Sequence, residues 1–190
     1  ESAIRAIGIP PRYRGRTLDD FDPNVSPSAG LALDMARKMV RGELRSLVLI
    51  GPPGVGKTHL AAGVIWALGD DPDVMRRHLP QWLNVPEAIV DLRAEMGVPD
   101  HPMIDLIRML RASSGLLVLD DLGREKASDW TGEQIYVLVN ARYERKLATL
   151  VTSNLAPAEL VANGYWPAIS RLAEDGPLVE IVAPDHRARR

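Results

Sequence analysis

The feature that most constrains the fold of this chain is a complete phosphate-loop pattern, G-x-x-x-x-G-K-[ST], which residues 51–58 match as GPPGVGKT. An apolar run at residues 47–50 precedes the pattern and is typical of a buried strand, and residues 58–68 are typical of a helix. Backbone N–H groups at a helix N-terminus attract anions, and glycines let the backbone approach them closely. A plain Gly/Pro turn is the alternative, but the complete spacing favours a phosphate cradle. The pattern therefore predicts a nucleoside triphosphate site.

The residue types in this loop also indicate which groups meet the nucleotide. Lys57 is expected to reach the β- and γ-phosphates, and the hydroxyl of Thr58 is expected to ligate Mg²⁺. His59 follows directly and has an alternative interpretation as a packing residue of the helix. The predicted nucleotide contacts in this stretch are Gly51, Pro52, Pro53, Gly54, Val55, Gly56, Lys57, Thr58 and His59.

Composition narrows the remaining classes of function. At 190 residues the chain fits one domain with a sizeable core. Its formal net charge is −2, so any contact with nucleic acid requires a local basic patch. The absence of cysteine excludes disulfides, thiol catalysis and cysteine-based zinc sites, and no apolar run approaches the roughly 20 residues of a membrane span. These observations favour a cytoplasmic protein without membrane contact.

Two regions of the chain differ in composition. Residues 1–27 are expected to form an irregular N-terminal arm, rich in Gly, Pro, Asp and Arg from residue 8 onward, and residues 28–190 the main domain. The first residues, ESAIR, contain neither an initiating Met nor the apolar core of a signal peptide. We therefore expect that the sequence is a fragment of a longer protein.

Strand and helix patterns alternate after the arm. Apolar runs predict strands at residues 47–50, 82–85, 116–119, 150–152 and 178–182. Helical spacing predicts helices at residues 28–41, 58–68, 86–96, 101–112 and 131–146, with short helical segments around Pro157 and Pro167. A capping-box spacing places the start of the 131–146 helix at Thr131. Such alternation predicts an α/β fold with a parallel five-stranded sheet flanked by helices.

Two carboxylates end the apolar run at residues 116–119. Asp120 and Asp121 are expected at the carboxyl end of a parallel strand, where ligands of open α/β sheets bind. Asp120 is expected to hold Mg²⁺ as a Walker B acid, and Asp121 to act as the general base that activates water. A turn or capping role for Asp121 is the alternative, because Leu122 and Gly123 follow. Asp is one methylene shorter than the Glu found in many such ATPases, so slow hydrolysis is expected.

A polar residue and two arginines complete the predicted site. Asn154 follows the strand at residues 150–152, and it would orient the attacking water if this strand inserts between the phosphate-loop strand and the Asp120 strand. Its alternative role is that of an ordinary turn residue. Arg171 and Arg187 are candidates for a guanidinium near the γ-phosphate, and a solvated or salt-bridged arginine is the alternative for each.

Several runs together resemble one group of ATPases. LVLIGPPGVGKTHLA (residues 47–61), LVLDDLG (117–123) and LVTSNL (150–155) are similar to runs of AAA+ ATPases in the DnaC/DnaI helicase-loader and IstB transposition-helper group. GIPPRY (8–13) resembles the segment that helps to seat adenine in that group, which gives Tyr13 a nucleotide contact. SRL (170–172) resembles the arginine-finger motif of that group, which makes Arg171 the candidate arginine finger. DHR (185–187) resembles the sensor 2 position, which makes Arg187 the candidate sensor 2 residue.

The resemblance implies an ATP-hydrolysing DNA-replication protein of the helicase-loader type. It also implies the AAA+/ASCE form of the P-loop NTPase fold, with little or no helical lid. ATP and Mg²⁺ are the implied cofactors, and hydrolysis is expected to be slow and stimulated by DNA or a partner. The implied partners are DNA, expected to be single-stranded, a replicative DNA helicase (or a transposase), and further copies of the chain through Arg171 in trans. The N-terminal partner-binding domain of loaders has no counterpart in this sequence.

Three alternatives stay open at this point. An IstB-like transposition helper would use the same ATPase core with a different partner. A nucleotide-dependent switch would bind ATP with little turnover, which the short Asp121 side chain would permit. A small-molecule kinase would need an acceptor pocket and a lid that no motif indicates, and it is the least favoured.

Basic residues outside these motifs have two interpretations. A solvated helix face is favoured over a DNA contact for Arg37, Lys38, Arg41, Arg142, Arg145 and Lys146. Arg124 and Lys126 follow the carboxylate pair and are candidates for a subunit interface or a DNA channel.

Overall fold

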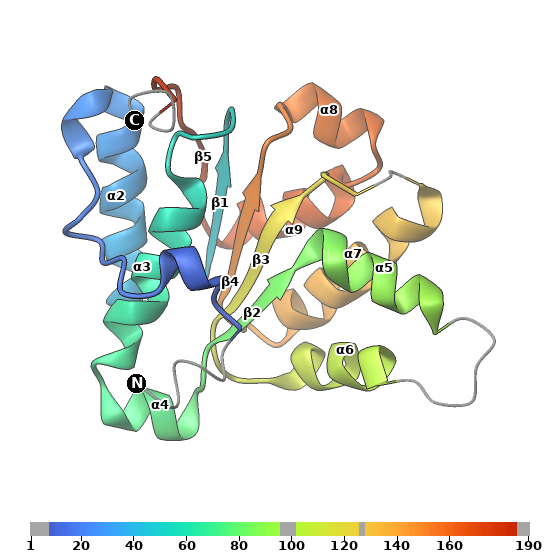
Figure 1. Ribbon diagram of the computed structural model, residues 1–190. Coiled ribbons are helices and arrows are strands. Elements are labelled where there is room, and N and C mark those ends of the chain that lie inside the picture. The colour runs from blue at the N-terminus through green and yellow to red at the C-terminus, as the bar shows by residue number, and fades with distance from the viewer. Residues whose placement is uncertain (1–7, 96–101, 126–127, 186–190) are drawn as a thin grey trace.

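A computed structural model of the protein describes residues 8–95, 102–125 and 128–185, and this part of the chain is built on a five-stranded sheet (Figure 1). The strands are β1 Ser46–Ile50, β2 Gln81–Asn84, β3 Leu117–Leu122, β4 Thr149–Ser153 and β5 Leu178–Glu180. They lie in the order β2-β3-β4-β1-β5, and each neighbouring pair is parallel. The predicted parallel five-stranded sheet is therefore confirmed, and β4 does insert between β1 and β3.

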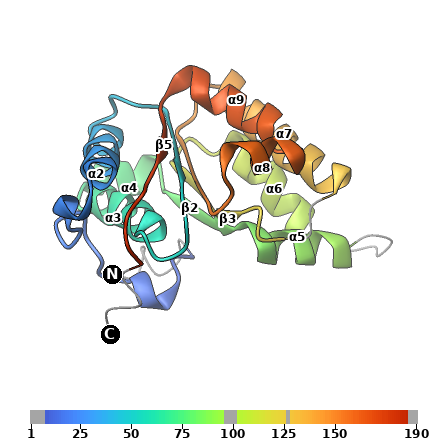
Figure 2. The same cartoon turned by 90° about the horizontal axis from the view of Figure 1, so that it is seen from above.

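Helices cover both faces of the sheet, which gives three layers (Figure 2). One face carries α2 Pro27–Val40, α3 Lys57–Gly69 and α4 Pro72–Arg77, and the other carries α5 Val85–Ala94, α6 Pro102–Ala112, α7 Asp129–Glu144, α8 Pro157–Ala162 and α9 Trp166–Asp175. Successive residues of β1 enter different cores: Leu47 and Leu49 pack with α2 and α3, whereas Val48 and Ile50 pack with the opposite helices. All four side chains are fully buried, as expected of a parallel strand covered on both faces.

Side-chain caps decide where two of the helices begin. The hydroxyl of Ser128 accepts a hydrogen bond from the N–H of Thr131 at 3.2 Å, so α7 begins at Asp129. The predicted start of this helix at Thr131 is wrong, because Ser128 caps the helix about one turn earlier by accepting the hydrogen bond from the Thr131 N–H. The carboxylate of Asp71 accepts hydrogen bonds from Asp73 N and Val74 N, which starts the short helix α4 where the sequence analysis expected no element.

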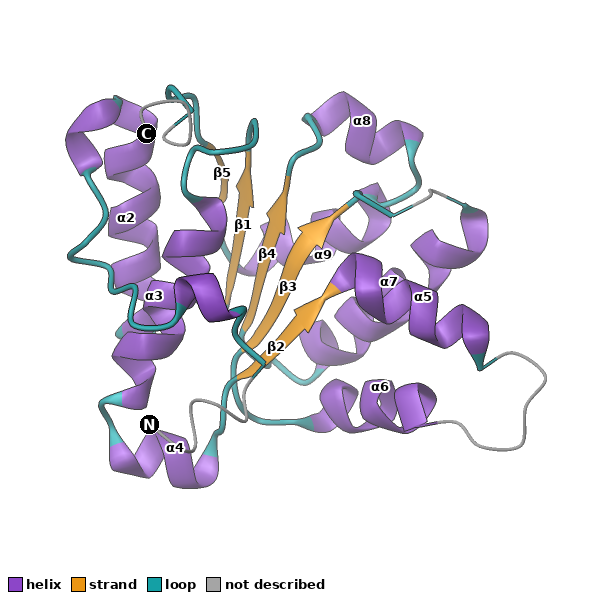
Figure 3. Cartoon of the chain, in the orientation of Figure 1, coloured by secondary structure: helices purple, strands orange, loops and turns teal. Residues whose placement is uncertain are grey.

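From residue 8 onward, the N-terminal arm lies against the domain and consists largely of loop, with short 3-10 turns at Pro11–Tyr13 and Pro23–Val25 (Figure 3). Leu18 and Phe21 are buried in the core that α2 and α3 share. Leu18 packs closely against Gly63 of α3, where a β-carbon would lie only 2.7 Å from the Leu18 side chain. The lack of a side chain at Gly63 therefore leaves room for Leu18 of the arm. The indole N–H of Trp66 donates to Tyr13 O at 3.2 Å. These contacts hold the arm beside the phosphate loop.

Arg142 of α7 is wholly buried, which contradicts its interpretation as part of a solvated or DNA-binding helix face. Its guanidinium donates hydrogen bonds to backbone carbonyls in the last turn of α6, in the segment between α6 and β3, and in the residue before β4. It also donates to the Thr149 hydroxyl. These acceptors converge near the amino-terminal ends of β3 and β4. Arg145 and Lys146, which follow, are exposed as expected.

Some predictions fall outside the described residues: the helix boundaries at residues 96 and 101, the role of Lys126, and the role of Arg187. Within the described ranges no helix follows β5. No helix among the described residues has the length and apolar character needed to cross a membrane.

Candidate nucleotide site

A cavity of about 690 Å³ opens where the carboxyl ends of the central strands meet the N-terminal arm. Its volume lies in the range of pockets that hold cofactors. The predicted site residues that line it are Tyr13, Pro53, Gly54, Gly56, Lys57, Thr58, His59, Asp121 and Asn154. The fold therefore gathers predicted contacts from four separate segments around one space.

The phosphate loop depends on glycine at its first position. Gly51 has a φ of 137°, and a β-carbon there would lie 2.4 Å from the carbonyl oxygen of Ile181. The ammonium of Lys57 donates to Gly51 O at 2.7 Å and to Pro52 O at 2.8 Å. Val55 is fully buried in the core and does not line the cavity. Gly51, Pro52 and Val55 thus shape the loop, whereas Lys57 presents its charge from within it.

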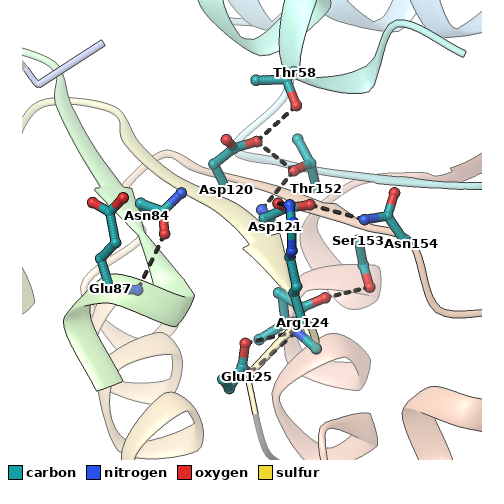
Figure 4. A network of polar contacts seen from close by, with 12 residues as sticks. Thr58, Asn84, Glu87, Asp120, Asp121, Arg124, Glu125, Thr152, Ser153 and Asn154 are labelled. Atoms are coloured by element: carbon teal, nitrogen blue, oxygen red, sulfur yellow. Dashed lines mark hydrogen bonds and ion pairs between the residues drawn. The ribbon is translucent and has the colours of Figure 1, made fainter. Parts of the chain in front are cut away.

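The pair expected to hold magnesium is present beside the loop (Figure 4). The hydroxyl of Thr58 donates to Asp120 Oδ1 at 3.1 Å, and the hydroxyl of Thr152 donates to the same oxygen at 2.7 Å. Hydroxyl and carboxylate oxygens are ligands that suit Mg²⁺, which usually takes few protein ligands and completes its shell with phosphates and water. Among the described residues no cluster of three or more His, Asp or Glu side chains could hold a metal. Thr58 and Asp120 therefore fit a magnesium ion that arrives with a nucleotide.

The Asp120 carboxyl is shaped by its burial, since it is only 4% exposed. Burial raises its pKa above the ordinary value of 3.8, while hydrogen bonds from Thr152 and Thr58 and, more weakly, the charge of Arg12 act in the opposite direction. A bound divalent cation favours the ionised form of such a carboxylate. The environment of Asp120 therefore couples its ionisation to metal binding.

The carboxylate of Asp121 is held by two neighbouring side chains. Its backbone has a φ of 65°, and the β3–β4 pairing shifts register between Leu119 and Leu122 around it. The amide of Asn154 donates to Asp121 Oδ1 at 2.8 Å, and the guanidinium of Arg124 donates to Oδ2 at 3.1 Å. The left-handed backbone turns this side chain out of the strand and toward the cavity that it lines.

Thr152 is a site residue that the sequence analysis did not single out. Its hydroxyl accepts a hydrogen bond from Asp121 N at 3.0 Å while it donates to Asp120. One side chain of β4 therefore bonds to the Asp120 carboxylate and to the backbone N–H of Asp121. Only the pairing of β3 with β4 places it there, so the local sequence carries no signal for it beyond a polar residue at a strand end.

The arm supplies the second side of the cavity. Arg12, Arg16 and Phe21 line it together with Tyr13, and the sequence analysis had considered only Tyr13 among them. The ring of His59 lies with Nε2 2.9 Å from Thr17 O and contacts the ring of Phe21 edge-on. His59 thus both lines the cavity and packs against the arm, which unites its two interpretations.

Arg171 does not lie at this cavity. It is on α9, where its guanidinium lies 3.4 Å from Glu174 Oε1 and 5.4 Å from the centre of the Tyr143 ring. The next residue, Leu172, accepts a hydrogen bond from the Ser46 hydroxyl at the start of β1, whereas the phosphate loop follows the end of β1. A five-residue strand spans about 13 Å. Arg171 is therefore near the opposite edge of the sheet from its own phosphate loop.

The loop after β3 is held in place by hydrogen bonds to the carboxylate of Glu125. The carboxylate of Glu125 accepts hydrogen bonds from Gly123 N at 3.1 Å and from the Tyr165 hydroxyl at 2.6 Å (Figure 4 shows Glu125). Tyr165 is fully buried, and burial together with the Glu125 hydrogen bond raises the pKa of its hydroxyl. The backbone that carries Arg124 is thereby tied to the turn between α8 and α9.

Comparison with known proteins identifies the family. A profile described as "IstB-like ATP binding protein" matches residues 15–163, which include the phosphate loop, both carboxylates and Asn154. The chain belongs to this family. The match confirms an ATP-binding AAA+ protein with the P-loop fold that the sequence resemblance implied.

Three known proteins illustrate the similarity. A Sinorhizobium fredii protein named as an insertion sequence ATP-binding protein is 27% identical over 205 residues, covering 100% of this chain and 62% of that protein. A crystal structure of the DnaC helicase loader has a TM-score of 0.77 and 28% identity, covering 91% of this chain and 100% of that one. A replication initiator DnaA structure bound to AMPPCP and single-stranded DNA has a TM-score of 0.71 and 20% identity, covering 93% of this chain and 52% of that one. The last comparison concerns the fold alone.

The IstB-like chain spans 62% of the length of its S. fredii relative and 38% of a Bacillus subtilis relative, YqaM. The matched part contains the nucleotide site, so the comparisons describe the ATP-binding core rather than the activity of whole proteins.

Proposed function

We propose that this IstB-like chain is a Mg²⁺-dependent ATPase whose active site is completed by a neighbouring subunit. The observation that carries the proposal is the continuous set of hydrogen bonds from Thr58 through Asp120, Thr152 and Asp121 to Asn154, beside the buried ammonium of Lys57 (Figure 4). A bare nucleotide-binding turn would not need a second carboxylate that is oriented by two neighbours.

In the proposed site, Lys57 meets the β- and γ-phosphates and Tyr13 meets the adenine on the arm side of the cavity. Thr58 and Asp120 hold Mg²⁺, which neutralises charge on the phosphates when it is bound. The backbone of Gly54 and Gly56, both with positive φ, approaches the phosphates closely. Arg187, in the sensor 2 position, stays a prediction for the same nucleotide.

Hydrolysis follows from the position of Asp121. A water molecule attacks the γ-phosphorus of ATP, its proton passes to Asp121, and the bond from the γ-phosphorus to the bridging oxygen breaks to release ADP and phosphate. Asn154, which already donates to Asp121, orients the water and the carboxylate together. The short side chain of Asp121 keeps this base farther from the γ-phosphorus than a Glu would be, so we expect slow turnover that DNA or a partner stimulates.

Arg171 supplies the remaining charge from another subunit. Because it lies near the opposite edge of the sheet from its own phosphate loop, it cannot serve the nucleotide of its own chain. A side-by-side assembly of copies would place Arg171 of one subunit at the γ-phosphate of the next, as an arginine finger in trans.

At the level of the cell, we propose that the protein controls assembly on DNA, single-stranded in particular, and delivers a replicative helicase. The similarity to the DnaC helicase loader over the whole of that chain supports this role, and ATP and DNA are both cytoplasmic substrates. A transposition helper that acts with a transposase is the second candidate. It is favoured by the IstB-like family match and by the insertion-sequence relative that covers this entire chain.

The ATPase proposal is tested by phosphate release from the full chain with and without single-stranded DNA. We expect Lys57→Ala to abolish activity and Arg171→Ala to abolish it in isolation. Mixing the two variants should restore activity, because one subunit offers an intact phosphate loop and the other an intact arginine. Arg145→Ala is the matched control, since Arg145 is exposed and its guanidinium donates a hydrogen bond to Ala141 O in the last turns of α7.

The outcomes separate the alternatives. If Arg171→Ala alone keeps wild-type turnover, or if the mixture of the two variants stays inactive, the trans role of Arg171 is refuted. ATP binding without turnover, even with DNA, would instead indicate the nucleotide-dependent switch. Titration of the chain against a purified replicative helicase and a transposase, each with ATP, then distinguishes the loader from the transposition helper by which protein it binds.

A further inference from the structure

Arg124 occupies a position on the cavity wall that the proposed function does not explain. It lines the same cavity as Lys57 and Asn154, yet its guanidinium is bonded to the proposed base, Asp121, at 3.1 Å. Asn154 engages the other oxygen of that carboxylate. Both oxygens of Asp121 are therefore engaged by donors, one by an amide and one by a cation.

The contact between Arg124 and Asp121 is of a kind that breaks easily. The Arg124 side chain is 71% exposed and that of Asp121 21%, so water screens the pair at its Arg124 end and the guanidinium can leave it easily. Phosphate competes well for such a cation, because a guanidinium can bind two phosphate oxygens at once. An anion that enters the cavity would thus draw Arg124 away from Asp121.

Only the side chain of Arg124 is free to make this exchange. Its backbone N–H is bonded to Asp121 O, and the residues on both sides are fastened, Gly123 through its N–H and Glu125 through Tyr165. The loop therefore keeps Arg124 at the wall where Asp121 and Asn154 meet, which is where the proposed site places the γ-phosphate. The other cations that line the cavity come from the arm, as Arg12 and Arg16 do, or from α3, as Lys57 does.

We propose that Arg124 binds the terminal phosphate of a nucleoside triphosphate in its own subunit and thereby releases Asp121 to act on water. The inference rests on the proposed ATPase function and adds a residue that distinguishes a triphosphate from a diphosphate. A diphosphate does not extend to Asn154, so Arg124 stays on Asp121 when ADP is bound. Arg124 therefore releases Asp121 only when the terminal phosphate that is to be cleaved is present.

The test compares the affinities of AMPPCP and ADP, with Mg²⁺, for the full chain by isothermal titration calorimetry. We expect Arg124→Ala to weaken AMPPCP binding about tenfold. The wild type gains a charged contact to phosphate and gives up only a weak ion pair with Asp121 when it binds AMPPCP, and the variant makes neither contact. ADP affinity should stay within about twofold of wild type by the same reasoning. Arg124→Lys, which keeps the charge without the two-oxygen contact, should fall between the two.

Arg108→Ala is the matched control, since Arg108 pairs with Asp105 at the same i,i+3 spacing and with nearly equal exposure, 69%, outside the cavity. Equal losses for AMPPCP and ADP, or no loss for either, would overturn the proposal. An unchanged nucleotide affinity combined with weaker binding of a single-stranded oligonucleotide would overturn it too, and would assign Arg124 to a DNA channel. A wild-type chain that binds neither nucleotide would refute the proposed function itself, and the Lys57→Ala variant shows which binding belongs to the phosphate loop.

Discussion

Replacing the buried Arg142 by Met tests whether this side chain holds the base of the sheet together. Met keeps an unbranched apolar stem of similar shape but donates no hydrogen bond. The change removes the Arg142 donor from four backbone carbonyls, those of Leu110, Ser113, Gly115 and Ala148, of which Ala148 O keeps a hydrogen bond from Leu117 N. The hydroxyl of Thr149 loses its contact with Nε as well.

The magnitude follows from these contacts and from the burial of the charge. Five hydrogen bonds from a charged donor, at about 1.5 kcal/mol each, amount to roughly 7 kcal/mol. Burial lowers the pKa of Arg142 to about 10, which corresponds to a desolvation cost of about 3 kcal/mol that Met does not bear. We therefore expect Arg142→Met to lower the free energy of unfolding by about 4 kcal/mol, a large part of the stability of an ordinary domain.

The measurement is urea denaturation of wild type, Arg142→Met and the control Arg145→Met, followed by circular dichroism. Arg145 lies in the turn that directly follows α7, is exposed, and should change the free energy of unfolding by less than about 0.5 kcal/mol. If Arg142→Met were no more destabilising than Arg145→Met, the carbonyls would be satisfied by other donors, and the structural role given to Arg142 would be refuted.

Three further predictions concern the nucleotide site. Asp120→Asn should raise the melting temperature at neutral pH, because the pKa of Asp120 is raised in the folded state and the wild type therefore loses stability as the pH rises from 3.8 through that pKa. The gain in melting temperature should vanish below pH 3.8, and a gain that persists there would contradict the assigned cause. Asp121→Asn should keep ATP affinity and stability near wild type, since Asn tolerates the left-handed backbone, but lower turnover by about 100-fold or more, and residual activity within tenfold would argue against a base role. Gly51→Ala should destabilise the protein by about 2 kcal/mol in denaturation experiments, because its β-carbon would meet Ile181 O, and an unchanged midpoint would show that the loop can move away.

The parts of the site that are contiguous in the chain could be predicted from the sequence. The phosphate loop is one stretch whose glycines, lysine and threonine act through local backbone geometry, so its pattern predicts its chemistry. The same holds for Asp120 and Asp121, because an apolar run followed by carboxylates indicates a buried strand and its carboxyl end. The alternation of strands and helices then limits the fold to a parallel α/β sheet.

The remaining features depend on which segments become neighbours, and no local pattern decides that. Thr152 bonds to the Asp120 carboxylate and to the Asp121 N–H only because β4 pairs with β3, and Arg124 faces Asp121 only because of the left-handed turn between them. Arg142 reads as a surface cation along its own helix, yet carbonyls from three other segments surround it. The sequence by itself determined the nucleotide chemistry and the fold class, since both reside in short runs of residues. The tertiary structure alone decided which polar groups satisfy one another, because hydrogen bonds between distant segments exist only once the sheet order has brought those segments together.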